Sequence, residues 1–134
     1  MGGLALDDLG PEVLDFLTER HLATLTTLRR DGSPHVVPVG FTYEPQARIA
    51  RVITSGDSVK AGNAARAGAF GALCQVDRGR WITLSGTLRV DTDPAAVADA
   101  VRRYAQRYRQ PRENPKRVVL IMEVTGLLGS SRLG

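Results

Sequence analysis

Cysteine, histidine and aromatic residues are scarce in this sequence. Its 134 residues include one cysteine, Cys74, two histidines, His21 and His35, and only 5% aromatic residues. A single cysteine excludes a disulfide framework within the chain, and Cys74 lies in an apolar run where we expect a buried, unreactive thiol. Neither histidine stands near a carboxylate or a cysteine at the spacing typical of metal ligands, so we expect no metal site.

Long hydrophobic runs and common catalytic motifs are missing as well. No stretch approaches the roughly 20 apolar residues that cross a bilayer, and the N-terminus lacks the basic flank of a signal peptide. We therefore expect a cytoplasmic protein with no membrane partner. The sequence contains neither GxSxG nor GxxxxGK[ST], the motifs of a serine nucleophile and a phosphate-binding loop. If the protein is an enzyme, a bound cofactor must therefore supply the reactive group.

Positive charge exceeds negative charge, with 18 lysines and arginines against 14 acidic residues and a net charge of +4. This balance suits either nucleic acid or an anionic small molecule, and the scarcity of aromatic residues argues against nucleic acid. A basic run late in the sequence has three interpretations. It forms a solvated helix face, binds an acidic cofactor tail, or binds the carboxylates of a substrate. It comprises Arg102, Arg103, Arg107, Arg109, Arg112, Lys116 and Arg117.

Segments rich in β-favouring residues alternate with turn residues, which predicts a mainly β protein of one domain over residues 1–134. Helical spacing predicts helices over 11–19, over 59–67 with Asp57 as N-cap, and from Pro94 to the break at Pro111. About six strands in hairpin order predict an antiparallel β-barrel with accessory helices. The predicted strands span residues 22–28, 35–43, 49–54, 70–76, 81–90 and 118–122.

Two residues are unusual for the strands in which they fall. Pro38 removes one ladder donor, which predicts either a simple edge strand or a bulge whose free backbone groups meet a ligand. Trp81, the only tryptophan, falls on the polar face of its strand beside Thr83 and Ser85. The large apolar ring is unfavourable in water, so we expect another surface to bury it. That surface is a subunit interface, a stacked planar ligand, or both together at one site.

Residues 51–60 are the most informative stretch for binding. A strand ends at Thr54, a Ser-Gly-Asp-Ser turn follows, and a helix begins with Lys60 in its first turn. Free backbone N–H groups favour an anion at such a corner, and Thr54, Ser58 and Lys60 add side-chain donors. A solvated surface corner is the alternative. Asn63 follows Lys60 by three residues, so it shares the same helical face and is a further candidate.

Two segments carry a resemblance to a known family. Residues 19–27 (Glu-Arg-His-Leu-Ala-Thr-Leu-Thr-Thr) and 31–39 (Asp-Gly-Ser-Pro-His-Val-Val-Pro-Val), in this order of elements, resemble the pyridoxamine-5′-phosphate-oxidase-like split barrels. Within them the chain is most similar to the actinobacterial deazaflavin-dependent branch, and in particular to biliverdin reductases that use coenzyme F420. The resemblance covers residues 14–129. It implies a six-stranded antiparallel split β-barrel of the FMN-binding-protein type, which forms a homodimer with two cofactor sites at the subunit interface.

The resemblance also implies which residues hold the cofactor. The strand before the anion corner and Lys60 would bind the cofactor phosphate, the segment 35–38 would lie against the tricyclic ring, and Gln75 and Trp81 would approach from the other subunit. The complete predicted set is His35, Val36, Val37, Pro38, Arg51, Val52, Ile53, Thr54, Ser58, Lys60, Asn63, Gln75 and Trp81.

The activity implied by the resemblance is hydride transfer from C5 of reduced coenzyme F420 to a conjugated small-molecule acceptor, with biliverdin reduction to bilirubin as the specific case. No side chain need then act as catalytic acid or base. An FMN-dependent oxidase or reductase on the same barrel and a non-catalytic flavin or haem carrier are alternatives. The chain ends without the arginine and histidine motif of pyridoxamine phosphate oxidases proper, so we do not expect that activity.

Overall fold

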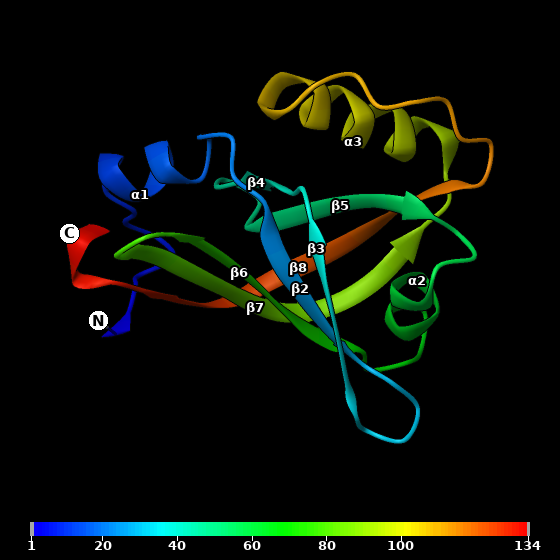
Figure 1. Ribbon diagram of the computed structural model, residues 1–134, viewed down its shortest axis with the longest axis horizontal. Helices are drawn as coiled ribbons and strands as arrows, with labels where there is room; N and C mark the ends of the chain where they lie inside the picture. The colour runs from blue at the N-terminus through cyan, green and yellow to red at the C-terminus, as the bar shows by residue number, and fades with distance from the viewer. Residues whose placement is uncertain (1, 134) are drawn as a thin grey trace.

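The computed structural model describes residues 2–133, and eight strands form one antiparallel sheet (Figure 1). The strands are β1 (Gly2–Gly3), β2 (Ala23–Leu28), β3 (Pro34–Val39), β4 (Thr42–Glu44), β5 (Ile49–Ser55), β6 (Phe70–Asp77), β7 (Arg80–Asp91) and β8 (Arg117–Gly129). They follow the order β3-β2-β6-β7-β8-β5-β4, and β1 pairs with the end of β8. The mainly β, antiparallel architecture predicted from the sequence is confirmed.

Both predicted hairpins form. Strand β2 pairs with β3, which places Pro38 opposite Thr24 on an edge strand, and β6 pairs with β7, which places Val76 opposite Trp81. An edge position tolerates the donor that proline lacks, so the simple edge-strand interpretation of Pro38 holds. The alternation along β7 is also as predicted, because Ile82 is buried whereas Thr83 is only half-buried.

The number of strands differs from the prediction. The expected strand over 35–43 is two strands, β3 and β4, because the chain turns at Gly40 and Phe41. Phe41 is fully buried, and its carbonyl accepts a hydrogen bond from Arg107 instead of a ladder partner. β3 and β4 end the sheet, and no ladder among the described residues joins them. The chain therefore has eight strands where six were predicted, in a sheet whose two end strands do not pair with each other among the described residues.

Three helices and one 3₁₀ turn accompany the sheet: α1 (Pro11–Phe16), α2 (Val59–Ala64), α3 (Pro94–Arg107) and η1 (Ser131–Leu133). α1 and α2 are shorter than predicted, and the N-cap of α2 is Ser58, whose Oγ accepts the N–H of Ala61 at 3.2 Å. Asp57 accepts from Ser55 instead, so its assignment as the cap was wrong. The described helices include none with the length and apolar character of a membrane span.

The core lies against the inner face of the sheet. Phe16 of α1 is fully buried there with Leu25, Leu73 and Leu84 from three neighbouring strands. α3 lies over β5 in Figure 1, and its Ala100 packs on β8 in a second, smaller cluster. β8 is thus buried on both sides over residues 118–122, as its apolar run predicted.

Cys74 lies outside this core. It stands on the other face of β6, opposite Thr24 and Thr83 on the neighbouring strands, and is only half-buried. Strand alternation explains the error, because its neighbours Leu73 and Gln75 take the buried positions. The apolar run around Cys74 therefore predicted a strand correctly but assigned this residue to the wrong face.

Candidate functional site

A hollow of about 250 Å³ lies where β3, the end of β5 and α2 meet α3, and we call it the β3–β5 hollow. Four residues of the predicted cofactor set line it, namely Pro38, Ile53, Thr54 and Lys60. The sequence separates these residues by up to 22 positions, and the sheet brings them together. The remaining lining consists of Val39, Gly40, Ser55, Tyr104, Pro111, Asn114 and Arg117.

The β3–β5 hollow is positively charged. Burial lowers the pKa of Lys60, because a partly desolvated ammonium group is less stable in its charged form. The Arg117 side chain donates to the neutral carbonyl of Arg112 at 2.6 Å and pairs with no carboxylate among the described residues. Among the described residues the lining contains no carboxylate. An anion bound here would offset the desolvation of Lys60, so the lining suits a phosphate group.

The hydroxyls at the turn before α2 are partly engaged. Thr54 Oγ1 lies 3.1 Å from Ser58 Oγ, and Ser58 Oγ also accepts the N–H of Ala61. Ser58 therefore acts first as a helix cap, whereas Thr54 lines the hollow itself. The predicted anion corner has the correct residues, but the Thr54 hydroxyl already donates to Ser58, so Lys60 is its principal donor for an anion.

Arg51 and Val52 do not face the β3–β5 hollow. Val52 is buried in the core, and the Arg51 side chain pairs with Glu44 of β4 at 3.0 Å and lies 4.0 Å from Asp99 of α3. Their backbones are paired with β8. The β3–β5 hollow lies at the end of β5, and of the segment 51–54 only Ile53 and Thr54 line it, so we leave Arg51 and Val52 out of the proposed site.

Asn63 and Gln75 are buried and have no free polar group for a ligand. Asn63 donates to Thr27 Oγ1 at 3.0 Å and accepts from Arg66 at 3.2 Å. Gln75 is completely buried, donates to the carbonyl of Phe16 at 2.8 Å and accepts from Arg107. The described structure therefore does not support cofactor contacts by either amide. Helical spacing indicated the face of Asn63 but not the partner strand beneath it.

The predicted ring-facing segment forms edge strand β3. Val36 is exposed and Val37 packs against the core. His35 Nδ1 is buried and has no hydrogen-bond partner among residues 2–133. Buried polar atoms are normally paired, so this nitrogen marks a place where a polar group of a ligand fits. Trp81 is half-buried on the outer face of the sheet and does not line the β3–β5 hollow.

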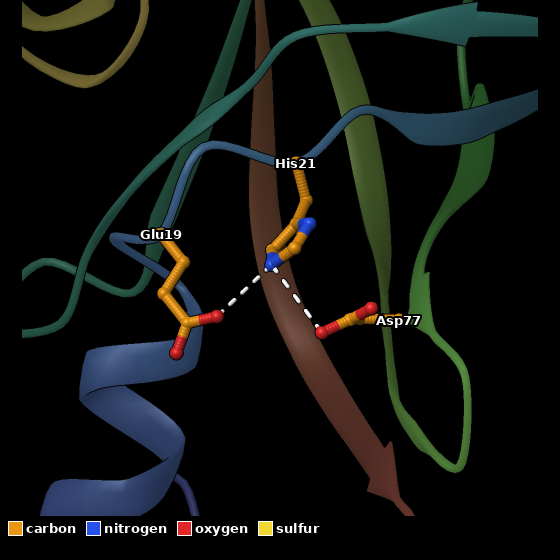
Figure 2. Close-up of side chains that lie close together, drawn as sticks. All are labelled: Glu19, His21 and Asp77. Atoms are coloured by element: carbon orange, nitrogen blue, oxygen red, sulfur yellow. Dashed lines mark hydrogen bonds and ion pairs between the residues drawn. The ribbon is translucent and has the colours of Figure 1, made fainter.

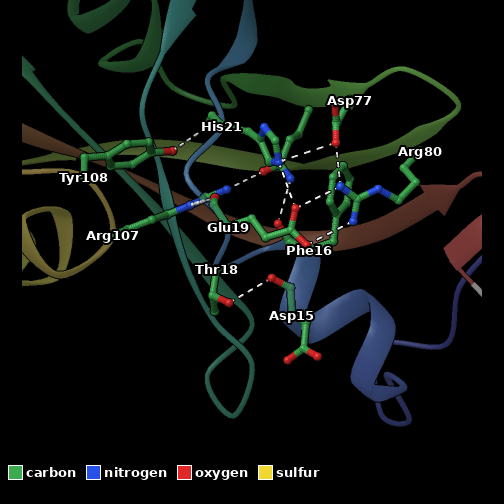
Figure 3. A network of polar contacts seen from close by, with 10 residues as sticks. Asp15, Phe16, Thr18, Glu19, His21, Asp77, Arg80, Arg107 and Tyr108 are labelled. Atoms are coloured by element: carbon green, nitrogen blue, oxygen red, sulfur yellow. Dashed lines mark hydrogen bonds and ion pairs between the residues drawn. The ribbon is translucent and has the colours of Figure 1, made fainter.

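A charged cluster joins the end of α1 to the β6–β7 turn. His21 Nε2 lies 2.9 Å from Glu19 Oε1 and 3.9 Å from Asp77 Oδ2, and Figure 2 shows the imidazole between the two carboxylates. Spacing along the sequence did not indicate this group of possible metal ligands, whose ligand atoms lie within 4.8 Å of one another. Arg80, however, bonds Glu19 at 2.9 Å and Asp77 at 2.5 Å (Figure 3). A cation already holds both carboxylates, so we assign no metal to the cluster.

The cluster predicts a change of stability with pH. Arg80 and then His21 lower the pKa of Glu19 from 4.5 to about 2. Since the folded pKa is depressed, this stabilisation is complete above the ordinary carboxyl pKa and is lost as the pH falls from 4.5 toward 2. We expect Arg80→Gln to flatten the fall of the melting temperature over this range. Parallel profiles for the two proteins in thermal scans would contradict this assignment.

A second network holds α3 against the strand ends. The Tyr108 hydroxyl donates to the carbonyl of His21 at 2.7 Å (Figure 3). It also accepts the N–H of Phe41 at 3.2 Å. The Tyr104 ring lies so close to Gly40 that a Cβ there would be 2.8 Å away. Gly40 and Tyr104 belong to the lining of the β3–β5 hollow. Sequence reasoning missed this network, for which Gly40 was a local signal, since glycine permits the close approach of another segment.

Comparisons with known proteins agree with this architecture. A family model described as pyridoxamine 5′-phosphate oxidase matches residues 9–129. An F420H(2)-dependent biliverdin reductase of Mycobacterium tuberculosis is 57% identical over 125 residues, which are 93% of this chain and 90% of that protein.

Two solved structures are similar in fold. A putative pyridoxamine 5′-phosphate oxidase from Lactobacillus delbrueckii has a TM-score of 0.73 and 20% identity, covering 96% of this chain and 99% of that one. An F420 reductase has a TM-score of 0.69 and 21% identity, covering 85% and 94%. At these identities the structural matches bear on the fold alone.

Proposed function

Because this chain belongs to the pyridoxamine 5′-phosphate oxidase family, we propose that it is an oxidoreductase that uses reduced coenzyme F420 to convert biliverdin to bilirubin. The high identity to a reductase with this activity, across nearly the whole of both chains, supports the choice of coenzyme and acceptor. The observation that carries the proposal in the structure is the β3–β5 hollow, which gathers Pro38, Ile53, Thr54 and Lys60 around an uncompensated positive charge.

The residues of the hollow have separate roles in this proposal. Lys60 and Arg117 neutralise the coenzyme phosphate, and Thr54 supplies a hydroxyl beside them. Edge strand β3 offers Val36 and Pro38, which share one face of the strand, as apolar surface for the ring system. The His35 side chain lies on the opposite face of β3. The bound reduced deazaflavin supplies the hydride. The protein's own contribution is to hold coenzyme and acceptor in a fixed orientation.

We also propose that the protein works as a homodimer through the outer face of its sheet. One cross-strand row consists of Thr24, Cys74, Thr83 and Leu128, with Pro38 at its end, and it carries no charged side chain. The nearby side chains of Val36 and Val76 are more than half exposed, at 55% and 57%. A neutral face with exposed apolar residues suits a second copy of the chain better than water.

Trp81 lies on this face, so its substitution tests the dimer. We expect Trp81→Ala to weaken association by about 2 kcal/mol or more, since large aromatic residues dominate interface energies. Coenzyme affinity should fall as well if the site is shared between subunits. Sedimentation equilibrium and coenzyme titration measure the two effects. Unchanged dimer stability together with unchanged coenzyme affinity would show that the Trp81 ring contributes to neither the interface nor the coenzyme site.

Direct titration distinguishes the coenzyme candidates. We expect the purified chain to bind coenzyme F420 saturably and to bind FMN more weakly, as measured by fluorescence quenching of each ligand. Tight FMN binding without affinity for coenzyme F420 would contradict the proposal and favour an FMN-dependent enzyme on the same fold.

A further inference from the structure

A second hollow, of about 280 Å³, lies between the segment after α1, strand β4 and α3, and we call it the α3–β4 hollow. Arg103 and Arg107 bring two guanidinium groups to its lining, which contains no carboxylate among the described residues. Leu17 and the ring of Tyr43 supply apolar wall. It shares no lining residue with the β3–β5 hollow.

The charge of Arg107 is not matched by a bonded carboxylate. Its three hydrogen bonds go to neutral oxygens, the carbonyls of Glu19 at 2.9 Å and Phe41 at 2.7 Å and the amide of Gln75 at 2.5 Å. A guanidinium has five N–H groups, so two remain for another acceptor. Burial lowers the pKa of Arg107, an effect that the charges of Tyr108 and Glu19 only partly oppose. A partly desolvated cation of this kind favours a bound anion.

Two hydroxyls of the same lining are also unsatisfied. Thr42 Oγ1 and the Tyr43 hydroxyl are buried and have no hydrogen-bond partner within residues 2–133. Burial raises the pKa of Tyr43, so its hydroxyl stays protonated and can donate. An unpaired buried hydroxyl is costly, and an anionic oxygen near the floor of the hollow accepts from such donors.

Arg103 completes the cationic side of the hollow. It lies one helical turn before Arg107, so both side chains come from the same face of α3. Arg103 pairs with Asp99 at 2.9 Å and lies 3.5 Å from Glu44, whereas neither carboxylate lines the hollow. Arg103 is thus held beside the hollow by two carboxylates and offers a ligand its remaining N–H groups, whereas Arg107 carries the charge that no bonded carboxylate matches.

We propose that the α3–β4 hollow binds a small organic carboxylate with an apolar body, separately from the coenzyme. The carboxylate lies toward Arg103 and Arg107, and the apolar body lies against Leu17 and Tyr43. The volume is near the lower limit of small-molecule pockets, which fits a ligand of the size of one aromatic ring with one carboxylate. This inference does not depend on the redox activity proposed above.

Benzoate titration of the full chain without coenzyme tests the proposal, with neutral benzamide as the matched ligand. We expect saturable benzoate binding by calorimetry and at least about tenfold weaker benzamide binding, the loss of one charge-assisted contact. Arg103→Gln should weaken benzoate binding about tenfold. Tyr43→Phe, which keeps the ring and removes the hydroxyl, should weaken it too.

Arg102→Gln is the control, because Arg102 also pairs with Asp99 but lies outside the lining. It should leave benzoate affinity unchanged, and added coenzyme F420 should leave benzoate bound. Equal affinity for benzoate and benzamide, or equal losses in Arg102→Gln and Arg103→Gln, would overturn the proposal. Displacement of benzoate by the coenzyme would show that its acidic tail, and not a separate carboxylate, takes the hollow.

Discussion

Lys60→Ala is expected to lose about 1.5 to 3 kcal/mol of coenzyme affinity, roughly a 10- to 150-fold increase in the dissociation constant. The half-buried ammonium is the charge that the β3–β5 hollow offers from its α2 side, and no carboxylate of the described lining neutralises it. Fluorescence titration with coenzyme F420 measures the change, and a thermal scan should show an intact fold.

Lys116→Ala is the matched control for this prediction. Lys116 is exposed, pairs with Asp57 at 3.3 Å and does not line the hollow. Its loss should leave affinity nearly unchanged. Because burial lowers the pKa of Lys60, coenzyme affinity should begin to fall at a lower alkaline pH than an exposed lysine would give. Equal effects of the two substitutions would refute the role of Lys60.

Gly86→Ala should destabilise the fold by about 3 kcal/mol or more, at the upper end of the cost of overpacking. Gly86 lies at an irregularity between β7 and β8, where the register shifts after Ser85. A Cβ at this position would lie 1.9 Å from the carbonyl oxygen of Glu123. The obstacle is backbone, so the two strands must separate to accommodate it. Chemical denaturation measures the loss.

Gly62→Ala is the matched control, and we expect it to raise the free energy of unfolding instead of lowering it. Gly62 is exposed in the middle of α2, and a Cβ there has open space around it. Alanine should stabilise the protein by about 0.5 to 1 kcal/mol through its better helix propensity. If both substitutions changed the unfolding free energy by the same amount, the close approach at Gly86 would not be the cause.

Local chemistry made the strands and hairpins readable from the sequence. Turn residues separate β2 from β3 and β6 from β7, and the apolar run in β8 is buried on both faces as its composition suggested. The predicted strand over 118–122 was too short, because β8 continues to Gly129. Residues 123–129 alternate between exposed and buried positions, so the apolar run does not extend over them. One-domain organisation and a cytoplasmic location stay predictions.

Tertiary partners explain what the sequence did not predict. Helical spacing gave Asn63 and Lys60 a common face, but α2 packs on β2, and Asn63 donates to Thr27 there. Gln75 was placed at an interface by resemblance, whereas its amide joins Phe16 to Arg107 inside the protomer. Such bonds join residues 32 or more positions apart, and no local pattern reveals them.

The Glu19, His21 and Asp77 cluster shows the same limitation. The β6–β7 turn brings Asp77 to His21, and the approach depends on the register of a distant hairpin. Glu19 is only two residues from His21, but the spacing patterns of metal ligands do not include this pair, so the sequence analysis missed their contact. Arg80 then decides the character of the cluster, since its charge holds both carboxylates.

The most direct test of the central claim is an anaerobic assay of the purified chain with reduced coenzyme F420 and biliverdin. We predict that the concentrations of oxidised coenzyme and of bilirubin, followed by their absorbance, rise together in equal amounts. The rate should fall in Lys60→Ala at subsaturating coenzyme. Tight binding of the coenzyme without any turnover of biliverdin would contradict the account and identify the protein as a carrier.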